Sequence, residues 1–408
     1  MGVQMRIRTV RLLVVTCIVT VCGYVYLSHQ NGSSKTDNVD NQAVVLQDTS
    51  LETYPLKIPR MYSSGNDANP GGGPRPLPTV NDGINHHSAN SALLPFVRNG
   101  TFYKDAVVNP LVYKYSEANS DMCNKTQSMT GDEVFLLILV ISAPDEEMTR
   151  YAIRMTWGNA TYLAERKTRL IFLVGRSSDP AMETKVRNEI NWYHDMVKAD
   201  FIDNYHNLPI KTLVGLNWVV RFCGQAKFVL KLYSDTLLNL NNLLGHLSQL
   251  SQTQRVFEGH LFENTIPVRE TNITEYTKWQ VTSSEYPFAV YPPYVNGPSY
   301  VISRDLVHLV VTMSEHVPYL KIEDVYIGMV MQTLGVVPQE DERYTQIKLK
   351  FETDEESLHK YFCYFSRSFV VSHNKEHMKM LEFWPTWKKL NLVDKWINCG
   401  KETLPYYA

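Results

Sequence analysis

Two adjacent acids, Glu323 and Asp324, open an apolar helical stretch and are the first candidates for chemistry in this 408-residue chain. A carboxylate in such a place can take a proton from a substrate hydroxyl group as a general base. Because acids are favoured at helix N-termini by the helix dipole, a purely structural role is the alternative. The first interpretation makes Asp324 the base. Its ordinary pKa near ~4 would leave it ionised without further perturbation.

A single acid, Asp235, follows the apolar run 227–232 and is the first candidate metal ligand. Carboxylate oxygens are the ligands that Mg²⁺ and Mn²⁺ prefer. The alternative is that Asp235 caps a helix beginning near Thr236. Farther upstream, Arg150 and Arg154 are spaced i, i+4 on one helical face, which by itself indicates a solvated or packing face.

Alternating apolar and helical segments must position these side chains. Continuous apolar runs predict buried strands at 133–142, 169–175, 227–232 and 255–262. Helical patterns lie between them at 181–194, 210–223 and 237–250, and further helices follow Ser303. This alternation indicates an α/β fold, in which crossover helices flank a mostly parallel central sheet.

The N-terminal residues indicate the compartment. Arg6, Arg8 and Arg11 precede the uncharged run 12–27, which predicts a signal anchor with a cytosolic tail at 1–11. A cleaved signal peptide is the main alternative, but no small-residue cleavage site follows the run. A buried core segment is the third reading. Sixteen residues make a short span, of the kind that thin early secretory membranes retain.

The rest of the chain is predicted to be lumenal. Five sequons support this orientation, at Asn31, Asn99, Asn124, Asn159 and Asn272. Four cysteines lie outside the predicted span: Cys123, Cys223, Cys363 and Cys399. In an oxidising compartment an even number predicts two disulfides, with three possible connectivities. The alternative is that they are buried free thiols.

Composition separates a stem from a folded domain. Residues 28–100 are rich in Asn, Ser, Asp, Gly and Pro and predict a flexible lumenal tether, followed by one domain at 101–408. The formal net charge of −2 gives no electrostatic case for binding nucleic acid. The chain has no Gly-x-Gly-x-x-Gly, P-loop or Gly-x-Ser-x-Gly motif, which argues against the dehydrogenase, kinase and hydrolase classes that use them.

Six sequence blocks, in order, resemble those of glycosyltransferase family 31, the β-1,3-galactosyltransferases and β-1,3-N-acetylglucosaminyltransferases. The blocks are RYAIRMTWG (150–158), DFIDNYHNLPIKT (200–212), Cys-x-x-AKFVLK (223–231), YPPYVNGPSYVISRD (291–305), EDVYIG (323–328) and the spacing His373-x₆-Met380-x₃-Trp384. The resemblance covers roughly residues 133–384.

The resemblance implies a GT-A fold and an inverting hexosyltransferase that forms a β-1,3 linkage. The donor would be UDP-Gal or UDP-GlcNAc, and the acceptor a glycan on protein or lipid. It also implies a Golgi or endoplasmic reticulum lumen, and with the predicted anchor we expect a single-pass type II Golgi membrane protein.

The same resemblance assigns roles in metal binding and catalysis. Asp235 corresponds to the last Asp of the family's Asp-Asp-Asp triplet, the direct metal ligand, whereas Tyr233 and Ser234 replace the first two acids. His373 corresponds to a C-terminal histidine close to the metal, and Mn²⁺ or Mg²⁺ would be bound weakly. Asp324 would be the general base, and Glu323 would orient the acceptor or the base.

Other matching positions are implied to bind the donor. They are Arg150, Arg154, Asp203, Lys231, Ser234 and Gly297, of which Lys231 could instead only flank its strand. Gly297 would let a loop backbone approach the donor sugar closely, and Pro298, replacing a usual glycine, would stiffen that loop. The degenerate triplet leaves a second function class open, a relative that binds nucleotide or glycan, or assists a partner enzyme, without catalysis.

Overall fold

The computed structural model describes residues 97–98, 101–102, 107–123, 134–345, 363–371, 380–382 and 384–385. The predicted tail and anchor, nearly all of the predicted stem, and His373 lie outside these residues. Within them, no helix combines the length and apolar character needed to cross a membrane.

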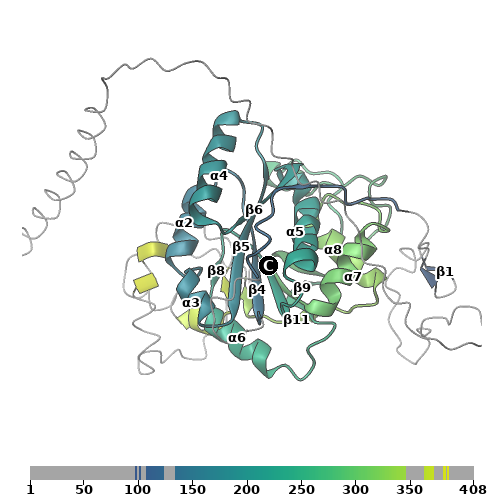
Figure 1. Ribbon diagram of the computed structural model, residues 1–408. Helices are drawn as coiled ribbons and strands as arrows, with labels where there is room; N and C mark the ends of the chain where they lie inside the picture. The colour runs from purple at the N-terminus through teal and green to yellow at the C-terminus, as the bar shows by residue number, and fades with distance from the viewer. Residues whose placement is uncertain are drawn as a thin grey trace, which may run out of the picture. The chain divides into compact units, whose positions relative to one another are not determined.

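An eight-stranded sheet forms the centre of the fold (Figure 1). Its order is β11 (Gln339–Glu340), β9 (Phe257–Phe262), β10 (Tyr294–Ser303), β7 (Phe228–Tyr233), β4 (Leu136–Ile141), β5 (Thr168–Arg176), β6 (Met196–Ile202) and β3 (Tyr115–Glu117). The central strands β7, β4, β5 and β6 are parallel, whereas β10 runs antiparallel to both of its neighbours. Every residue of β4 is buried, because helices cover both faces of the sheet.

Alternate residues of β4 face two separate apolar clusters. Leu137 and Leu139 face the cluster formed with α5 (Leu208–Phe222), α7 (Arg304–Ser314) and α8 (Glu323–Thr333). Leu136 and Ile138 face the cluster formed with α2 (Glu147–Met155), α3 (Ala160–Ala164), α4 (Pro180–Tyr193) and α6 (Leu240–Gln249). Figure 1 shows α2 and α4 on one side of the sheet and α5, α7 and α8 on the other.

Shorter elements complete the described fold. A three-stranded sheet joins β12 (Tyr344–Thr345), β13 (Val370–Val371) and β8 (Leu237–Leu238), and β1 (Val97–Arg98) pairs with β2 (Thr101–Phe102). Two 3₁₀ helices, η2 (Tyr205–Asn207) and η3 (Thr274–Trp279), follow β6 and precede β10.

The predicted α/β architecture with a mostly parallel centre is confirmed, with two corrections. The helix expected at 237–250 begins only at Leu240, where Asn239 caps it by accepting a hydrogen bond from the amide of Asn242. Capping by Asp235 is therefore wrong. The expected loop around Gly297 is also wrong, because Gly297 lies within β10. The β-branched and aromatic residues that follow Gly297 fit a buried strand.

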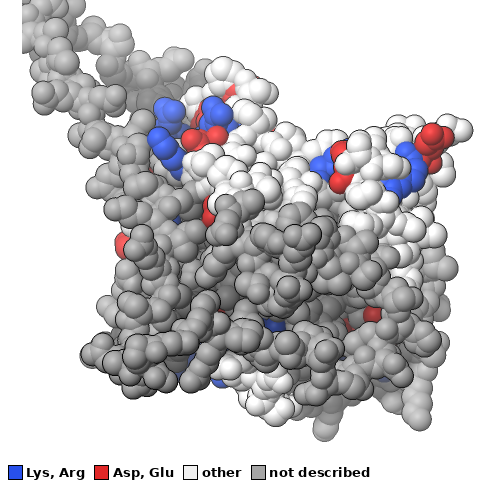
Figure 2. Space-filling model, turned by 90° about the vertical axis from the view of Figure 1, so that its right-hand side faces the viewer, with Lys and Arg blue, Asp and Glu red and all other residues white. Residues whose placement is uncertain are grey.

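Covalent and surface features also bear on the sequence predictions. Cys123 pairs with Cys223, and Cys363 is disulfide-bonded to a partner outside the described residues, so these three are not free thiols. Of the sequons, Asn159 and Asn272 are exposed, whereas Asn31, Asn99 and Asn124 lie outside the described residues. On the face shown in Figure 2, Lys and Arg lie next to Asp and Glu among the described residues, as the near-neutral net charge leads one to expect.

Candidate active site

Glu323, the first residue of α8, is a buried carboxylate with four side-chain donors around it. It is 4% exposed. Oε1 accepts hydrogen bonds from Thr212 (2.9 Å) and Tyr300 (2.8 Å), and Oε2 accepts them from Lys231 (2.9 Å) and Tyr233 (3.3 Å). These contacts fill the surroundings of the carboxylate. The position beside Asp324, on the wall of the same cavity, is compatible with orienting the base or the acceptor, and both roles stay predictions.

Asp324 lies beside this network but faces a cavity. Its Oδ2 accepts a hydrogen bond from the amide of Gly297 (3.1 Å), and its Oδ1 accepts one from the amide of Val325 (2.9 Å). Burial, followed by the negative charge of Glu323, raises the pKa of Asp324 to about 6, although the two amides and Lys231 oppose the shift. The expectation of an ordinary pKa was therefore wrong, because an aspartate in a desolvated site next to another acid holds its proton more tightly.

Lys231 does more than flank its strand. Its ammonium group donates to Glu323 and to the carbonyl oxygen of Gly297 (2.5 Å), and it lies 3.8 Å from the centre of the Tyr233 ring. Burial lowers the pKa of Lys231, and the nearby acids counteract this effect. Lys231 is thus the buried counter-ion of Glu323, so the alternative that it only flanks its strand is wrong, and its predicted contact with the donor stays a prediction.

Gly297 is required by the space around it. A Cβ atom at this position would lie 3.0 Å from the Tyr233 hydroxyl, 3.2 Å from Oε2 of Glu323 and 3.4 Å from Oδ2 of Asp324. The glycine therefore lets β10 approach the two acids. The predicted close approach of this backbone to the donor sugar stays a prediction.

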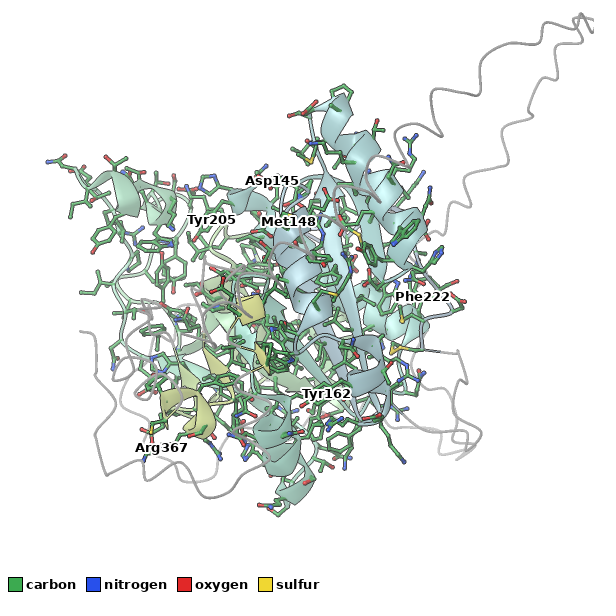
Figure 3. The ribbon with its side chains drawn as sticks, turned by 90° about the vertical axis from the view of Figure 1, so that its left-hand side faces the viewer. Asp145, Met148, Tyr162, Tyr205, Phe222 and Arg367 are labelled. Carbon is green, nitrogen blue, oxygen red and sulfur yellow. A yellow bond between two sulfur atoms is a disulfide. The ribbon has the colours of Figure 1, made fainter. Side chains whose placement is uncertain are left out.

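A cavity of about 470 Å³ opens in front of Asp324. Its lining includes Gly297 and Lys278 and is rich in aromatic side chains, namely Tyr205, Tyr233, Phe262, Trp279, Tyr291 and Tyr294. Figure 3 labels Tyr205, which follows β6, at the same end of the molecule as Asp145 and Met148, which follow β4. An apolar cavity with one carboxylate of raised pKa is the usual form of a small-ligand site.

A second polar group lies where β7 ends. Ser234 donates a 2.6 Å hydrogen bond to Oε2 of Glu146, which also accepts from Ser142 (3.0 Å) and from the amide of Ala143 (2.8 Å). Asp235 follows in a turn that Thr236 closes by donating to the carbonyl oxygen of Tyr233. Ligands of parallel α/β sheets bind at this carboxyl edge. The sequence analysis missed Glu146, whose only sequence signal is an acid shortly after the first strand.

Asp203 and Lys211 brace the neighbouring strand ends. Asp203 accepts hydrogen bonds from the amide of Gly175 (2.7 Å) and from Lys211 (2.6 Å), which also donates to the carbonyl oxygen of Ser142 (2.7 Å). Burial lowers the pKa of Lys211, and Asp203 opposes this shift. The sequence analysis singled out Asp203 but missed Lys211, which lies in the same block, eight residues later.

The two arginines of the first block are committed to protein partners. Arg150 is fully buried, and its guanidinium group donates to Glu189, to Ser142 and to the carbonyl oxygens of Ala143 and Pro144. Arg154 donates to both oxygens of Asp195 and to Glu189. This geometry matches the packing alternative better than the predicted contact with the donor, because Arg150 holds the β4–α2 loop and Arg154 joins α2 to Glu189 of α4 and to Asp195.

Two of the described acids bring carboxylate oxygen atoms to the carboxyl edge. Asp235 is half-buried there, and Glu146 brings a second carboxylate through its contact with Ser234. Such oxygens suit Mg²⁺ or Mn²⁺. The charge of Asp235 also acts on Lys231, which shows that this edge and the Asp324 cavity are electrostatically connected.

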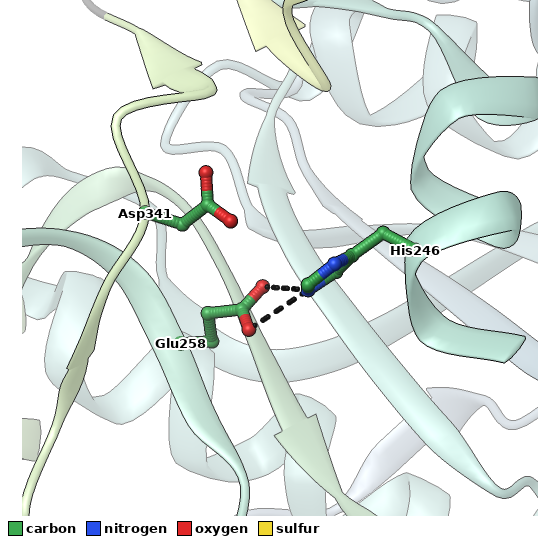
Figure 4. Close-up of side chains that lie close together, drawn as sticks. All are labelled: His246, Glu258 and Asp341. Carbon is green, nitrogen blue, oxygen red and sulfur yellow. Dashed lines mark hydrogen bonds and ion pairs between the residues drawn. The ribbon is translucent and has the colours of Figure 1, made fainter. Parts of the chain in front are cut away.

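A further cluster on the α6 side has potential metal-ligand atoms within 4.8 Å of one another, in His246, Glu258 and Asp341 (Figure 4). Arg343 donates to Nδ1 of His246 (3.1 Å) and to Asp341 (2.8 Å). Because Nδ1 accepts, Nε2 carries the proton and donates to the two oxygens of Glu258 at 3.0 Å. These hydrogen bonds account for the cluster as a structural network.

Comparison with known proteins identifies the family of the chain. A profile described as Galactosyltransferase matches residues 148–342. The chain is 39% identical over 202 residues to beta-1,3-galactosyltransferase 5 of Pan paniscus, which covers 50% of this chain and 66% of that protein. It is 34% identical over 246 residues to beta-1,3-galactosyltransferase 1 of Mus musculus, which covers 60% of this chain and 72% of that protein.

One solved glycosyltransferase structure, involved in the glycosylation of the major capsid of PBCV-1, shares 10% identity at a TM-score of 0.33. It covers 61% of this chain and 99% of its own, and this low score supports no further conclusion. The sequence matches are decisive, because the mouse protein combines 34% identity with coverage of most of its length. The chain belongs to the β-1,3-galactosyltransferase family, glycosyltransferase family 31.

Proposed function

We propose that the protein is an inverting β-1,3-galactosyltransferase with a GT-A fold, which moves galactose from UDP-Gal to a glycan on protein or lipid. The observation that carries the proposal is Asp324, a carboxylate of raised pKa on the wall of an aromatic cavity. The names of the two relatives favour galactose over N-acetylglucosamine. UDP-GlcNAc remains the donor to compare.

In the proposed reaction, Asp324 takes the proton of the acceptor hydroxyl group. The oxygen then forms a bond to the anomeric carbon of the donor sugar while the bond from that carbon to UDP breaks on the opposite face. One such displacement inverts the anomeric configuration. A base with a pKa of about 6 is a stronger proton acceptor than an ordinary aspartate and is still mostly ionised at neutral pH.

The supporting residues keep this base in position. Glu323 is fixed by its four donors, and the amide of Gly297 holds Oδ2 of Asp324, so the carboxylate is already placed before substrate enters. Preorganisation of this kind avoids reorganisation at the moment of reaction.

The diphosphate of the donor is assigned to the carboxyl edge beside Ser234. There Asp235, with Glu146 close to Ser234 and with His373 contributed by the family pattern, would hold Mn²⁺ or Mg²⁺. When bound, such an ion neutralises negative charge on the leaving diphosphate as a Lewis acid.

A non-catalytic role is the second candidate, and one observation favours it. Tyr233 and Ser234 stand where the family has acids, and the Tyr233 hydroxyl is turned toward Glu323. The edge therefore has less negative charge for holding a cation than the family triplet provides. A protein of this kind would bind nucleotide or glycan without transfer.

Release of UDP tests the proposal directly. Detergent-solubilised full-length protein is incubated with UDP-Gal or UDP-GlcNAc, with methyl β-N-acetylglucosaminide as acceptor, with and without Mn²⁺. We expect acceptor-dependent release from UDP-Gal. Binding of UDP without release from either donor would favour the non-catalytic role.

The proposed setting is the Golgi membrane, with residues 12–27 as a single-pass type II anchor and the folded domain in the lumen. The exposure of Asn159 and Asn272 supports it, since both sequons are accessible to glycosylation. Treatment of the cellular protein with peptide-N-glycosidase is expected to increase its gel mobility. An unchanged mobility would contradict the lumenal orientation.

A further inference from the structure

We propose that Tyr205 and Trp279 form an aromatic platform for the sugar ring of the acceptor, beside the base Asp324. This inference rests on the proposed function and goes further, because it assigns one end of the cavity to the acceptor. The preferred ligand of this platform is a pyranose ring with one face made of C–H bonds.

The two rings are fixed to each other although they come from distant parts of the chain. Tyr205 belongs to η2 and Trp279 ends η3, 74 residues later. The indole nitrogen of Trp279 donates a 2.7 Å hydrogen bond to the Tyr205 hydroxyl oxygen. Both side chains line the cavity and are nevertheless partly exposed, at 39% for Tyr205 and 37% for Trp279.

Several contacts hold the two rings in place, and one of them comes from Lys278 in the cavity lining. Tyr276 packs against Trp279 with ring centres 5.5 Å apart. The ammonium group of Lys278 lies 4.6 Å from the Trp279 ring and 5.3 Å from the Tyr205 ring. A hydrogen bond between His206 and the carbonyl oxygen of Lys278 (3.3 Å) joins η2 to η3. Rings held in this way lose little conformational freedom when a ligand binds.

The platform lies within electrostatic reach of the base. The pKa of Tyr205 is raised to about 12, chiefly by burial, and the charges of Asp324 and Glu323 contribute. Because Tyr205, Trp279 and Asp324 line the same cavity, a sugar lying on the two rings can present a hydroxyl group to Asp324.

The chemistry of the surface favours the acceptor over the donor diphosphate. The cavity lining contains Lys278 and Lys321 as its cations, and Lys321 is paired with Glu285 (2.8 Å). Ser234, Asp235 and Glu146 do not belong to the lining. A flat ring surface suits the C–H face of a sugar, because contact removes apolar area from water without requiring a matching charge. The main competitor is the uracil ring of the donor, which could also stack here.

The test compares Trp279→Ala with Trp279→Phe in the full-length protein. Loss of an aromatic contact worth about 1.5 kcal/mol corresponds to about 10-fold in affinity, so Trp279→Ala should raise KM for methyl β-N-acetylglucosaminide by about 10-fold. Its KM for UDP-Gal should stay near wild type. Trp279→Phe, which keeps a ring, should restore most of the acceptor affinity.

Trp192→Ala is the matched control, because Trp192 is 79% exposed on α4 and is not part of the cavity lining. It should leave both KM values unchanged. An increase in KM for UDP-Gal without an increase for the acceptor would overturn the proposal and assign the rings to the nucleotide.

A binding measurement separates this inference from the proposed function. Saturation-transfer NMR with methyl β-N-acetylglucosaminide and methyl β-galactoside detects sugar binding without turnover. Suppose that wild type releases no UDP but binds either sugar, and that Trp279→Ala does not bind it. The platform then stands and the transferase proposal fails. Equal binding in both proteins, or no binding by wild type, overturns the platform.

Discussion

Two neighbouring regions of this protein differ in how they hold negative charge. At the Asp324 cavity, Glu323 has four donors and a buried lysine counter-ion, and Asp324 has two amide donors. At the carboxyl edge of the sheet, Tyr233 and Ser234 provide hydroxyl groups, and Ser234 donates to Glu146. The first region holds two adjacent acids in place. The second has hydroxyl groups at the two positions before Asp235, where the resemblance to the family implies acids.

Tyr233 connects the two regions. It ends β7 immediately before Ser234, and yet its hydroxyl group points to Glu323 and its ring lies under the ammonium group of Lys231. The side chain next to the carboxyl edge therefore serves as a donor in the network around Glu323.

The largest effect is expected for Asp324→Asn, which keeps the size of the side chain but cannot take a proton. Transfer should fall by about 10²-fold or more, the usual scale for loss of a general base. Steady-state turnover with UDP-Gal measures the loss, and calorimetry should show that UDP binding is retained. Glu165→Gln, at an exposed acid far from the network, is the control. Turnover equal to wild type in Asp324→Asn would contradict the assignment of the base.

Gly297→Ala should have the next largest effect. The added Cβ would press against the Tyr233 hydroxyl and the two acids, and overpacking of this kind costs about 1–3 kcal/mol. Because the amide of Gly297 also holds Asp324, we expect about a 10-fold loss of kcat, comparable to that free-energy range. Thermal unfolding and kcat measure the two effects.

Gly245→Ala is the matched control for that substitution. Gly245 lies in α6, and a Cβ there would meet no atom within 4 Å. Since alanine is the better helix former, this variant should be as stable as wild type or slightly more so, with unchanged kcat. Equal behaviour of the two variants would show that the space around Gly297 is not restrictive.

The pH dependence gives a smaller but specific effect. Because the pKa of Asp324 is raised to about 6, the rate should fall to about half at pH 6 and continue to fall below it. The sign for stability is the opposite of that for a salt-bridged acid. In the folded protein Asp324 keeps its proton up to about pH 6, whereas in the unfolded chain it loses the proton near the ordinary pKa of an aspartate. The contribution of Asp324 to stability therefore decreases as the pH rises from that ordinary value toward 6.

Two measurements check this pH effect. The acid limb of the kcat profile should have an apparent pKa near 6, and the melting temperature of Asp324→Asn relative to wild type should be higher at pH 7.5 than at pH 4.5. An acid limb near ~4, the ordinary value for an aspartate, would contradict the raised pKa.

The sequence predicted most of the fold and only part of the site. Long apolar runs such as residues 133–142 predict buried strands because burial on both faces leaves a continuous pattern. β10 was missed because its strand begins among prolines and glycine, which are typical of loops. The pair Glu323 and Asp324 was identified from its block, but Glu146 and Lys211 are isolated in sequence. They reach the site only because the parallel strands end at one edge.

Arg150 and Arg154 show the limit of spacing as evidence. Their i, i+4 pattern correctly predicted one helical face, but spacing does not tell whether an anion or a buried acid faces them. Glu189 and Asp195 come from α4 and the segment after it, and no local pattern links them to the arginines. The partner of a charged side chain is a tertiary property.

The smallest expected effect concerns Ser234→Asp, which restores one acid at the carboxyl edge. In the present structure, the new carboxylate would lie against Glu146, whose Oε2 is 2.6 Å from the Ser234 hydroxyl, so the two acids would repel each other unless a cation lies between them. Ser234→Asp should therefore bind Mn²⁺ several-fold more tightly, and Asp235→Ala should lose Mn²⁺ binding.

Tyr233→Asp should behave differently, because its side chain would meet Glu323 rather than the metal edge. Calorimetric titration with Mn²⁺, alongside melting temperature with and without the ion, distinguishes the three variants. If all three bind Mn²⁺ as wild type does, the carboxyl edge does not hold the metal, and the contrast between the two regions reduces to the base alone.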